Sequence, residues 1–533
     1  MAKSCGKFIT TFLTSIPLSG VMDLTKMLGE FRNADEPYHI QAIHDVLVSE
    51  IPPERGFTNP RDGSVALIKL GAQGVGITGP EIAGAVARLG GIGTLTNTVM
   101  SNAKFHHRDS SLADGDRNLN QYMMALTRMY ESLANAQGGL LAENTLVKTI
   151  DFKRNTDLLL RQSELFALRN MGVQFPTFDL VDLAAGAVQD YSNYIATCTQ
   201  KGIQPIPASL FVSTLEQLIR SLEISKRRYK SLPFSITKEN GEAAGHNGAQ
   251  NTKASSIEEL ERYLSDSINK NSMPRLILAG GFQLGEDLAS AIHLGASAIQ
   301  IGSRFTISRE SDASKYHKQL ILNARYQSTI PTEWISPFSN GEKALIHVAT
   351  KGKYGYIGPV LSTSGMYVTG VVNPFVLGLF AGHSVKKRPC EGPGHENRGC
   401  LTVCGYSPAS IDRVNKLNVG EFCIEEALQM ALKGDPKRGL YFAGVHAGKI
   451  PERESMPVWH ILKNIYLEAF AYATEHLPLG QKVMEHFKEL KSVGEAALTH
   501  RLFTHFDPAK DAYAPAVPSA PPKQVIPIYP AFV

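Results

Sequence analysis

Eight apolar runs that alternate with amphipathic segments constrain the fold of this chain more than any other feature. The runs begin at Val65, Ile92, Leu146, Val173, Ile203, Leu232, Arg275 and Ser297. Segments with helical periodicity follow them, at residues 80–89, 155–170, 213–226 and 285–294 among others. Such alternation is typical of parallel βαβ units, and eight units close into a barrel rather than an open sheet. The sequence therefore predicts an α/β protein with a (β/α)8 TIM barrel.

The chain is longer than a barrel of about 250 residues requires. We expect the barrel over residues 62–326, with a long insertion at 97–145 between its second and third strands. The predicted remainder is an N-terminal extension at 1–61, a lid or insertion region at 327–475 that is partly helical, and a helical end with a Pro- and Ala-rich tail at 476–533.

Composition excludes several classes of protein. Hydrophobic residues make up 43% and charged residues 20% of the 533 residues, which suits a large folded core. A net charge of +4 over this length is too weak to indicate a nucleic-acid partner, and no apolar run approaches the roughly 20 residues that cross a bilayer. Six cysteines are too few for a disulfide scaffold, so we expect a reducing, cytoplasmic location. A homodimer stays open.

The first glycine-rich turn, residues 74–79, reads Gly-Val-Gly-Ile-Thr-Gly and follows a predicted strand. This pattern is the fingerprint of a dinucleotide-binding fold, which also needs an acidic residue about 20 positions further on. The corresponding segment reads Gly-Thr-Leu-Thr-Asn-Thr and contains no acid. We therefore interpret the turn as the first loop at the catalytic end of a barrel, where glycines let a flat ring approach the backbone.

The last two runs also end in glycine-rich turns, which contain Gly280 and Gly281 after the seventh run and Gly302, Ser303 and Arg304 after the eighth. In a barrel these two loops, with a nearby helix N-terminus, form the usual phosphate site. The helix expected after the seventh run fits, because its dipole and free N–H groups attract an anion. We expect a phosphate-bearing ligand here, against the alternative of two ordinary turns. Arg304 either adds charge or fixes the loop.

A histidine follows the sixth run, inside the small-residue loop Glu-Ala-Ala-Gly-His that ends at His246. A residue at the carboxyl end of a barrel strand faces the bound ligand, and an imidazole with a pKa near ~6.5 suits proton abstraction near neutral pH. Glu239 and Glu242 are candidates to orient His246 or to contact the ligand. For Glu242 a solvated loop charge is an equal alternative.

Cys390, His395, Cys400 and Cys404 place four possible zinc ligands in one short segment. Their spacing matches no standard zinc finger or ribbon. We therefore favour packed thiols and predict no metal.

The three late motifs resemble those of the nitronate monooxygenases, once called 2-nitropropane dioxygenases. That family carries E-A-G-G-H, then A-G-G, then M-G-T-R-F, and this chain has Glu-Ala-Ala-Gly-His, Ala-Gly-Gly-Phe and Ile-Gly-Ser-Arg-Phe at similar spacing. The resemblance covers about residues 64–100 and 230–306. Short segments from Trp334, Asn397 and Gly439 resemble the longer bacterial members.

The resemblance implies a barrel with a helical lid, flavin mononucleotide (FMN) held without a covalent bond, and small-molecule substrates with dioxygen. It implies that His246 is the catalytic base, that Gly280, Gly281, Gly302 and Ser303 hold the phosphate, and that Gly74, Val75 and Gly76 line the flavin ring. By the same resemblance, Asn97 and Glu239 bond the polar edge of the ring, and Gly245 lies beside the cofactor.

Several positions depart from the family pattern. The first strand leads into Ala-Gln-Gly-Val-Gly rather than A-P-M-x-G, Ala244 replaces a glycine, and Glu239 often corresponds to Gln. These changes leave the substrate open. The leading hypothesis is oxidation of alkyl nitronates by oxygen to carbonyl compounds. The alternatives are an NAD(P)H-dependent flavin reductase, acting on quinones or enoyl thioesters, and a non-catalytic scaffold with a degenerate flavin site.

Overall fold

The structure, a computed structural model, describes the barrel and the helices packed around it. The described residues are 35–60, 62–73, 77–96, 139–146, 163–164, 178–184, 187–212, 214–219, 222–223, 234–239, 246–247, 259, 262, 274–322, 334–336, 345–348, 355–357, 360–361, 421–423, 431–434, 441–444 and 446–499.

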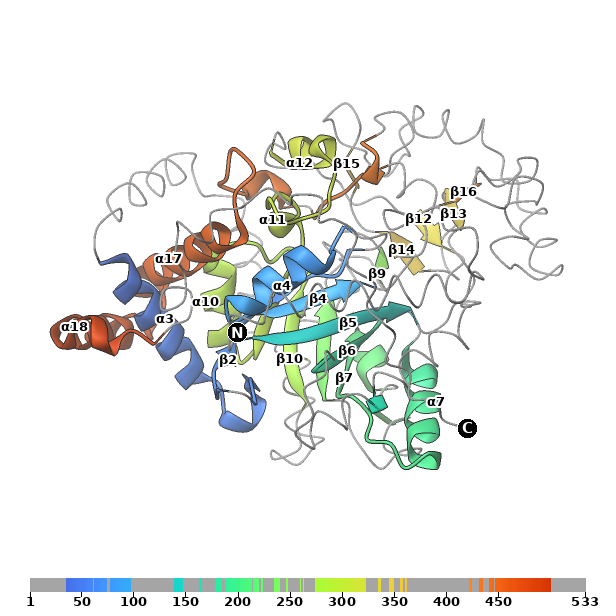
Figure 1. Cartoon of the computed structure of the whole chain (residues 1–533), viewed down its shortest axis with the longest axis horizontal. Coiled ribbons are helices and arrows are strands. Elements are labelled where there is room, and N and C mark those ends of the chain that lie inside the picture. The colour runs from blue at the N-terminus through green and yellow to red at the C-terminus, as the bar shows by residue number, and fades with distance from the viewer. Residues whose placement is uncertain are drawn as a thin grey trace, which may run out of the picture.

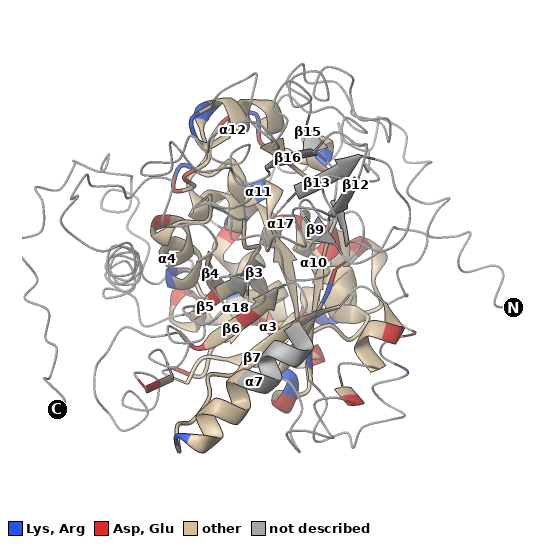
Figure 2. Ribbon diagram, turned by 90° about the vertical axis from the view of Figure 1, so that its right-hand side faces the viewer, with Lys and Arg blue, Asp and Glu red and all other residues tan. Residues whose placement is uncertain are grey.

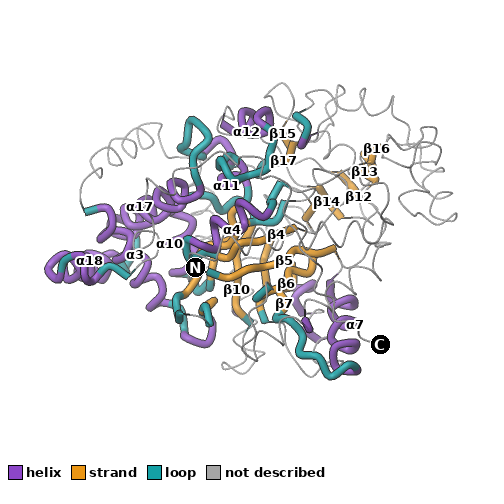
Figure 3. Tube along the Cα trace, in the orientation of Figure 1, coloured by secondary structure: helices purple, strands orange, loops and turns teal. Residues whose placement is uncertain are grey.

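Eight parallel strands form a closed barrel at the centre of the molecule, with helices outside it (Figure 3). They are β3 (Ile68–Leu70), β4 (Ile92–Thr96), β5 (Leu140–Leu146), β6 (Leu180–Ala184), β7 (Ala208–Val212), β8 (Ser235–Glu239), β10 (Arg275–Ala279) and β11 (Ala298–Ile301). Each strand pairs with its neighbour in sequence order, and β11 closes the circle against β3. The predicted (β/α)8 barrel is confirmed.

Two strands lie elsewhere than predicted. The third strand, β5, occupies Leu140–Leu146 and not a run beginning at Leu146, so it takes up the end of the predicted insertion. Its polar residues Glu143 and Asn144 interrupt the apolar pattern, yet both are buried in the barrel wall. The fourth strand, β6, begins at Leu180, where the predicted run from Val173 ends. The strand prediction was wrong here because buried polar side chains break the apolar pattern of these strands.

The helices predicted at 80–89 and 285–294 are confirmed as α4 (Pro80–Arg88) and α10 (Gly285–His293). Proline at the first position of α4 presets the helical φ and lacks an N–H group that the first turn cannot pair. An added Cβ on Gly93 would lie 1.9 Å from the carbonyl oxygen of Ala83, so only glycine lets α4 pack this closely on β4. The described part of 213–226 is helical at 215–219 and 222–223, and 155–170 lies outside the described residues except 163–164. Another helix, α7 (Ala187–Gln200), follows β6.

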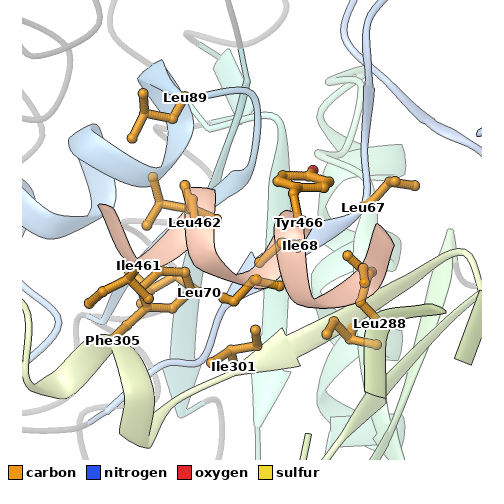
Figure 4. Packing of buried hydrophobic residues seen from close by; sticks show 14 of the residues in the cluster. Leu67, Ile68, Leu70, Leu89, Leu288, Ile301, Phe305, Ile461, Leu462 and Tyr466 are labelled. Carbon is orange, nitrogen blue, oxygen red and sulfur yellow. The ribbon is translucent and has the colours of Figure 1, made fainter. Parts of the chain in front are cut away.

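The eighth helix of the barrel comes from far downstream in the chain. After β11 the chain forms only the short helix α11 (Ser303–Thr306) and then α12 (Lys315–Leu322). The long helix α17 (Val458–His476) packs between α10 and α4 and closes the outer layer. Its Ile461 and Leu462 lie over Leu70 and Phe305 (Figure 4). The segment between α12 and α17 is therefore an insertion that leaves the barrel from the carboxyl ends of the strands, which is the catalytic face of such barrels.

The two ends of the described chain meet on one side of the barrel. Helix α3 (Glu36–Glu50) lies beside α17 and α18 (Gly480–Val493), as Figure 1 shows. The ring of His39 stacks on Phe487 at 4.4 Å and meets the edge of Phe470 at 4.5 Å. One hydrophobic core thus includes parts of the predicted N-terminal extension, the barrel and the C-terminal region, while the predicted domain limits themselves stay predictions.

A short hairpin covers the amino end of the barrel. Strands β1 (Phe57–Thr58) and β2 (Val65–Ala66) pair antiparallel, and Phe57 packs against Ile92, Leu140 and Ile277 inside the barrel. The amino end is therefore filled with apolar side chains, which leaves the carboxyl end for ligands.

Several described parts of the insertion form strands. A five-stranded sheet has the order β16 (Glu421–Cys423), β13 (Leu345–Val348), β12 (Trp334–Ser336), β14 (Gly355–Ile357), β9 (His246–Asn247). A smaller pair joins β15 (Val360–Leu361) to β17 (Tyr441–Phe442). Because β9 belongs to the barrel segment, the insertion is hydrogen-bonded to the loop that follows β8.

Figure 2 shows Lys and Arg scattered among Asp and Glu over the ribbon. Among the described residues, none of the helices is sufficiently long and apolar to span a bilayer. The cytoplasmic location and the homodimer stay predictions.

Candidate functional site

The carboxyl ends of β8, β10, β11 and β3 bring the predicted phosphate residues together. Ala279 at the end of β10 pairs in register with Glu239 on one side and with Gln300 on the other. Gly280 and Gly281 therefore leave the barrel directly beside Glu239 and beside the Gly302–Ser303 turn. We call these two turns the glycine corners.

The glycine corners leave little room for side chains, and one of them has a conformation that other residues resist. Gly280 and Gly281 have φ of 84° and 88°, in the left-handed region where a Cβ atom is strained. An added Cβ on Gly302 would lie 3.2 Å from the Nε2 atom of Gln73, and one on Gly71 would lie 3.1 Å from the Cα atom of Gly302. Both corners therefore present backbone rather than side chains, as close approach of a phosphate requires.

Ser303 begins the short helix α11 and is buried. The first N–H groups of any α-helix have no partner within the helix, so those of α11 can face an anion. The Oγ atom of Ser303 accepts a hydrogen bond of 2.8 Å from the N–H of Gly444. Because the oxygen acts as an acceptor there, the hydroxyl proton of Ser303 is left to be donated to a ligand.

The N-terminus of α10 does not have the role that we expected for it. The Oδ2 atom of Asp287 accepts hydrogen bonds from the N–H groups of Gln283 and Leu284, at 2.7 and 2.8 Å. The Oε2 atom of Glu468 accepts a third, from Gly285, at 2.9 Å. Carboxylates already occupy this helix end, so α11 and the glycine corners are the candidates for binding an anion. The sequence does not reveal this, because Glu468 lies on the distant helix α17.

Arg304 fixes the loop and does not add charge to the corner. Its guanidinium is fully buried and bonds to Glu452, Glu468 and the carbonyl oxygen of Gln283, with distances of 2.7–3.2 Å. Burial by itself would raise the pKa of Glu452, but the charge of Arg304 and its hydrogen bonds hold that pKa below the usual value. Of the two alternatives for Arg304, the structure shows the second.

Glu239 ends β8 at the mouth of the barrel and is partly buried. Burial raises the pKa of its carboxyl group from 4.5 to about 8. The group is therefore mostly protonated at neutral pH and can both donate and accept a hydrogen bond. A neutral carboxyl of this kind suits the polar edge of a heterocyclic ring.

The backbone of His246 lies in β9, where it pairs with Ile357 of β14. The insertion thus holds the histidine loop through main-chain hydrogen bonds. Gly74, Val75, Gly76, Asn97 and Gly245 lie outside the described residues, as do Glu242 and the segment with Cys390, His395, Cys400 and Cys404. Their roles stay predictions. Within the described ranges, no group of three His, Cys, Asp or Glu residues is placed to hold a metal.

Sequence reasoning missed a polar layer inside the barrel. Lys69 of β3 reaches across to Asp182 of β6, with 2.5 Å between Nζ and Oδ1, and both side chains are sealed from solvent. Ser209 and Thr237 share a further hydrogen bond of 3.0 Å. Lys69 lies in an apolar stretch of sequence, and only its place across from Asp182 explains why a lysine is tolerated there.

Several buried polar atoms near this layer have no hydrogen-bond partner in the described structure. They are the hydroxyl oxygens of Thr94, Thr96 and Ser235, Oδ2 of Asp182 and Oε1 of Gln300. Buried polar groups are normally paired, so the unpaired atoms of Thr96 and Gln300, which lie toward the carboxyl ends of their strands, point to a missing ligand or water. Thr96 is the last residue of β4, at the mouth.

These features fit FMN, the cofactor that the resemblance implies. The glycine corners and the Ser303 hydroxyl suit its phosphate. Thr96 and the protonated Glu239 suit the polar groups of its ring. The polar donors and acceptors therefore agree with the cofactor at both of its ends.

Comparison with known proteins gives a partial match. A nitronate monooxygenase family model matches residues 235–345, which run from β8 through His246 and both glycine corners to β13. A probable nitronate monooxygenase of Staphylococcus saprophyticus is 31% identical over 117 residues, which are 21% of this chain and 33% of the relative. One of Bacillus subtilis is 37% identical over 95 residues, which are 18% of this chain and 27% of the relative. The chain thus spans about a third of the length of these relatives.

Among solved structures, FabK from Thermotoga maritima has a TM-score of 0.46 and 17% sequence identity, covering 80% of this chain and 96% of that chain. The family resemblance predicted from the motifs is confirmed over residues 235–345.

Proposed function

We propose that this chain is an FMN-dependent oxidoreductase that oxidises alkyl nitronates with dioxygen to carbonyl compounds, as a nitronate monooxygenase does. One observation carries the proposal. The family match at 235–345 coincides with the part of the barrel that contains the two glycine corners and the His246 loop.

The cofactor would lie across the carboxyl ends of the strands. Gly280, Gly281, Gly302 and Ser303 hold the phosphate, and Glu239 bonds the polar edge of the ring. Asn97 and the backbone of Gly74, Val75, Gly76 and Gly245 complete the ring site in this proposal. When bound, the flavin supplies one-electron transfer between the nitronate and dioxygen.

The residues of the chain handle the proton. His246 takes the proton from the carbon beside the nitro group of a neutral nitroalkane and becomes an imidazolium next to the nitronate anion. A pKa near ~6.5 for a free imidazole makes this transfer feasible at neutral pH. Glu239 remains protonated, so it places no negative charge beside the anion.

The test replaces His246 and compares two substrates. His246→Asn should abolish oxygen consumption with a neutral nitroalkane and preserve it with the preformed nitronate, since the nitronate no longer needs a base. His293→Asn, on the exposed face of α10, is the matched control and should preserve both activities. Equal loss on both substrates with His246→Asn would remove the base role.

Two measurements on the purified wild-type protein distinguish this function from the flavin reductase and the non-catalytic scaffold. Anaerobic bleaching of the bound flavin by NADPH, without a response to nitronate, would replace the proposal by a flavin reductase. A purified chain that takes up no FMN would favour a non-catalytic scaffold.

A further inference from the structure

A segment from the far side of the insertion contacts both glycine corners. We call residues 443–444 and 446–449 the clamp. The N–H of Gly444 donates to the Oγ atom of Ser303 at 2.8 Å. The Nδ1 atom of His446 lies 3.0 Å from the carbonyl oxygen of Gly281. One contact thus reaches the corner after β11 and the other reaches the corner after β10.

The contact with Gly281 defines the form of the His446 ring. A carbonyl oxygen can only accept a hydrogen bond, so Nδ1 must carry the proton. The imidazole therefore holds the peptide group that follows Gly281, a residue in the left-handed region with φ of 88°. Glycine by itself leaves this peptide free to turn, and the hydrogen bond fixes it.

The clamp is anchored in the core on both sides. Ala443, Ala447 and Ile450 are buried in the main hydrophobic cluster. Tyr441, just before the clamp, is buried edge-on against Tyr316 at 5.2 Å and His317 at 5.3 Å. A 3₁₀ helix, η5 (Ala447–Lys449), ends the clamp. His446 and Gly444 are therefore held in place rather than carried on a free loop.

The clamp also places a positive charge near two acidic residues beside the glycine corners. The first turn of α10 carries Glu286 and Asp287, which would repel an anion. Burial raises the pKa of Asp287, while hydrogen bonds from the Gln283 and Leu284 amides and the charge of Lys449 act in the opposite direction. Burial also raises the pKa of Glu286, and the charge of Lys449 acts against that rise. The charge of Lys449 thus offsets part of the charge of the two acids in the first turn of α10.

From these contacts we propose that the clamp holds the glycine corners in the geometry that binds the phosphate of FMN, with His446 as a positioning residue for Gly281 and Gly444 as one for Ser303. The inference rests on the proposed function, since it takes FMN as the ligand. It adds a phosphate-specific role for a segment that lies far from both corners in sequence.

The test separates the phosphate from the ring by comparing FMN with riboflavin. Binding of each to the apoprotein is followed by quenching of flavin fluorescence. His446→Leu removes the donor that holds the Gly281 peptide, and we expect about tenfold weaker binding of FMN, the size of effect that losing one net hydrogen bond has, with riboflavin unchanged. His446→Asn keeps an N–H group near the position of Nδ1 and should restore most of the FMN affinity.

A second variant covers the case in which His446→Leu does not fold. Lys449→Gln should weaken FMN binding a few-fold at low ionic strength, with less effect in high salt and none on riboflavin. His476→Leu, on the exposed end of α17, is the matched control and should change neither affinity.

The outcomes distinguish this inference from the proposed function. If the wild-type apoprotein binds no FMN, both the clamp inference and the proposed function are contradicted. Suppose instead that the wild type binds FMN. If the variants at His446 and Lys449 then lose affinity for riboflavin as strongly as for FMN, or lose affinity for neither, the role of the clamp is contradicted and the proposed function is not.

Discussion

Arg304 of α11 and Glu468 of α17 are joined by two hydrogen bonds, of 2.7 and 2.8 Å, in a site sealed from solvent. Glu452 takes the remaining side of the guanidinium, and Asn464 donates to Glu452 at 3.2 Å. Through this network the turn after the eighth strand is tied to the helix that completes the barrel. The position of Ser303, one residue before Arg304, depends on it.

Removal of Glu468 should therefore destabilise the protein strongly. Glu468→Leu removes one of the two carboxylates that pair with Arg304 and leaves the N–H of Gly285 without its acceptor in the core. We expect the free energy of unfolding in urea to fall by about 3–5 kcal/mol, as for other buried pairs that lose one member. Lys482→Ala, which breaks an exposed pair with Glu50, should cost less than about 1 kcal/mol. Similar losses in both variants would contradict the role of the network.

For the ion pair of Lys69 and Asp182, we expect the loss of stability in a single variant to be partly recovered when the second partner is also removed. Burial lowers the pKa of Lys69 and raises that of Asp182, so each depends on the other to stay charged. Lys69→Met should destabilise the fold by about 3–5 kcal/mol, because it strands the carboxylate. Adding Asp182→Leu to that variant should recover part of the loss. Equal or greater loss in the double variant, measured in the same urea titration, would show that the pair stabilises the fold beyond its mutual neutralisation.

Glu239 should make the stability of the apoprotein depend on pH. Its carboxyl group keeps its proton up to a pKa of about 8 in the folded state but loses it near 4.5 when unfolded. Between these values the folded state binds the extra proton, so stability falls as the pH rises. Glu239→Gln cannot ionise, and its Tm relative to wild type should increase from pH 5 to pH 8 and then level off. A constant difference across that range would contradict a raised pKa.

Gly281 should be indispensable for FMN. Gly281→Asp introduces a side chain where φ is 88° and sets a negative charge at the phosphate position. We expect the purified variant to lose its yellow colour and its flavin absorbance, with the far-ultraviolet circular dichroism of the wild type. Gly202→Asp, also at positive φ but with open space around it, is the matched control and should keep the flavin. Normal flavin content in Gly281→Asp would contradict the phosphate site.

Local sequence was sufficient wherever one strand or turn determines the feature. Eight apolar runs predicted eight barrel strands, because burial on both faces demands apolar residues in each strand. The glycines after the last two strands predicted turns without obstructing Cβ atoms, and Gly280 and Gly281 have positive φ, which few other residues adopt. The position of the strand at Leu140–Leu146 was predicted wrongly, because the polar residues Glu143 and Asn144 interrupt its apolar pattern.

Contacts between segments that are distant in sequence are determined only by the tertiary structure. Glu468 looks like an ordinary surface residue in sequence and Arg304 allowed two roles, and their burial and pairing exist only because α17 returns to the barrel. The N-terminus of α10 looked free for an anion until Glu468 and Asp287 were found on its amides. Sequence periodicity reports how one segment meets the core, whereas the partner of a buried charge depends on which remote segment packs against it.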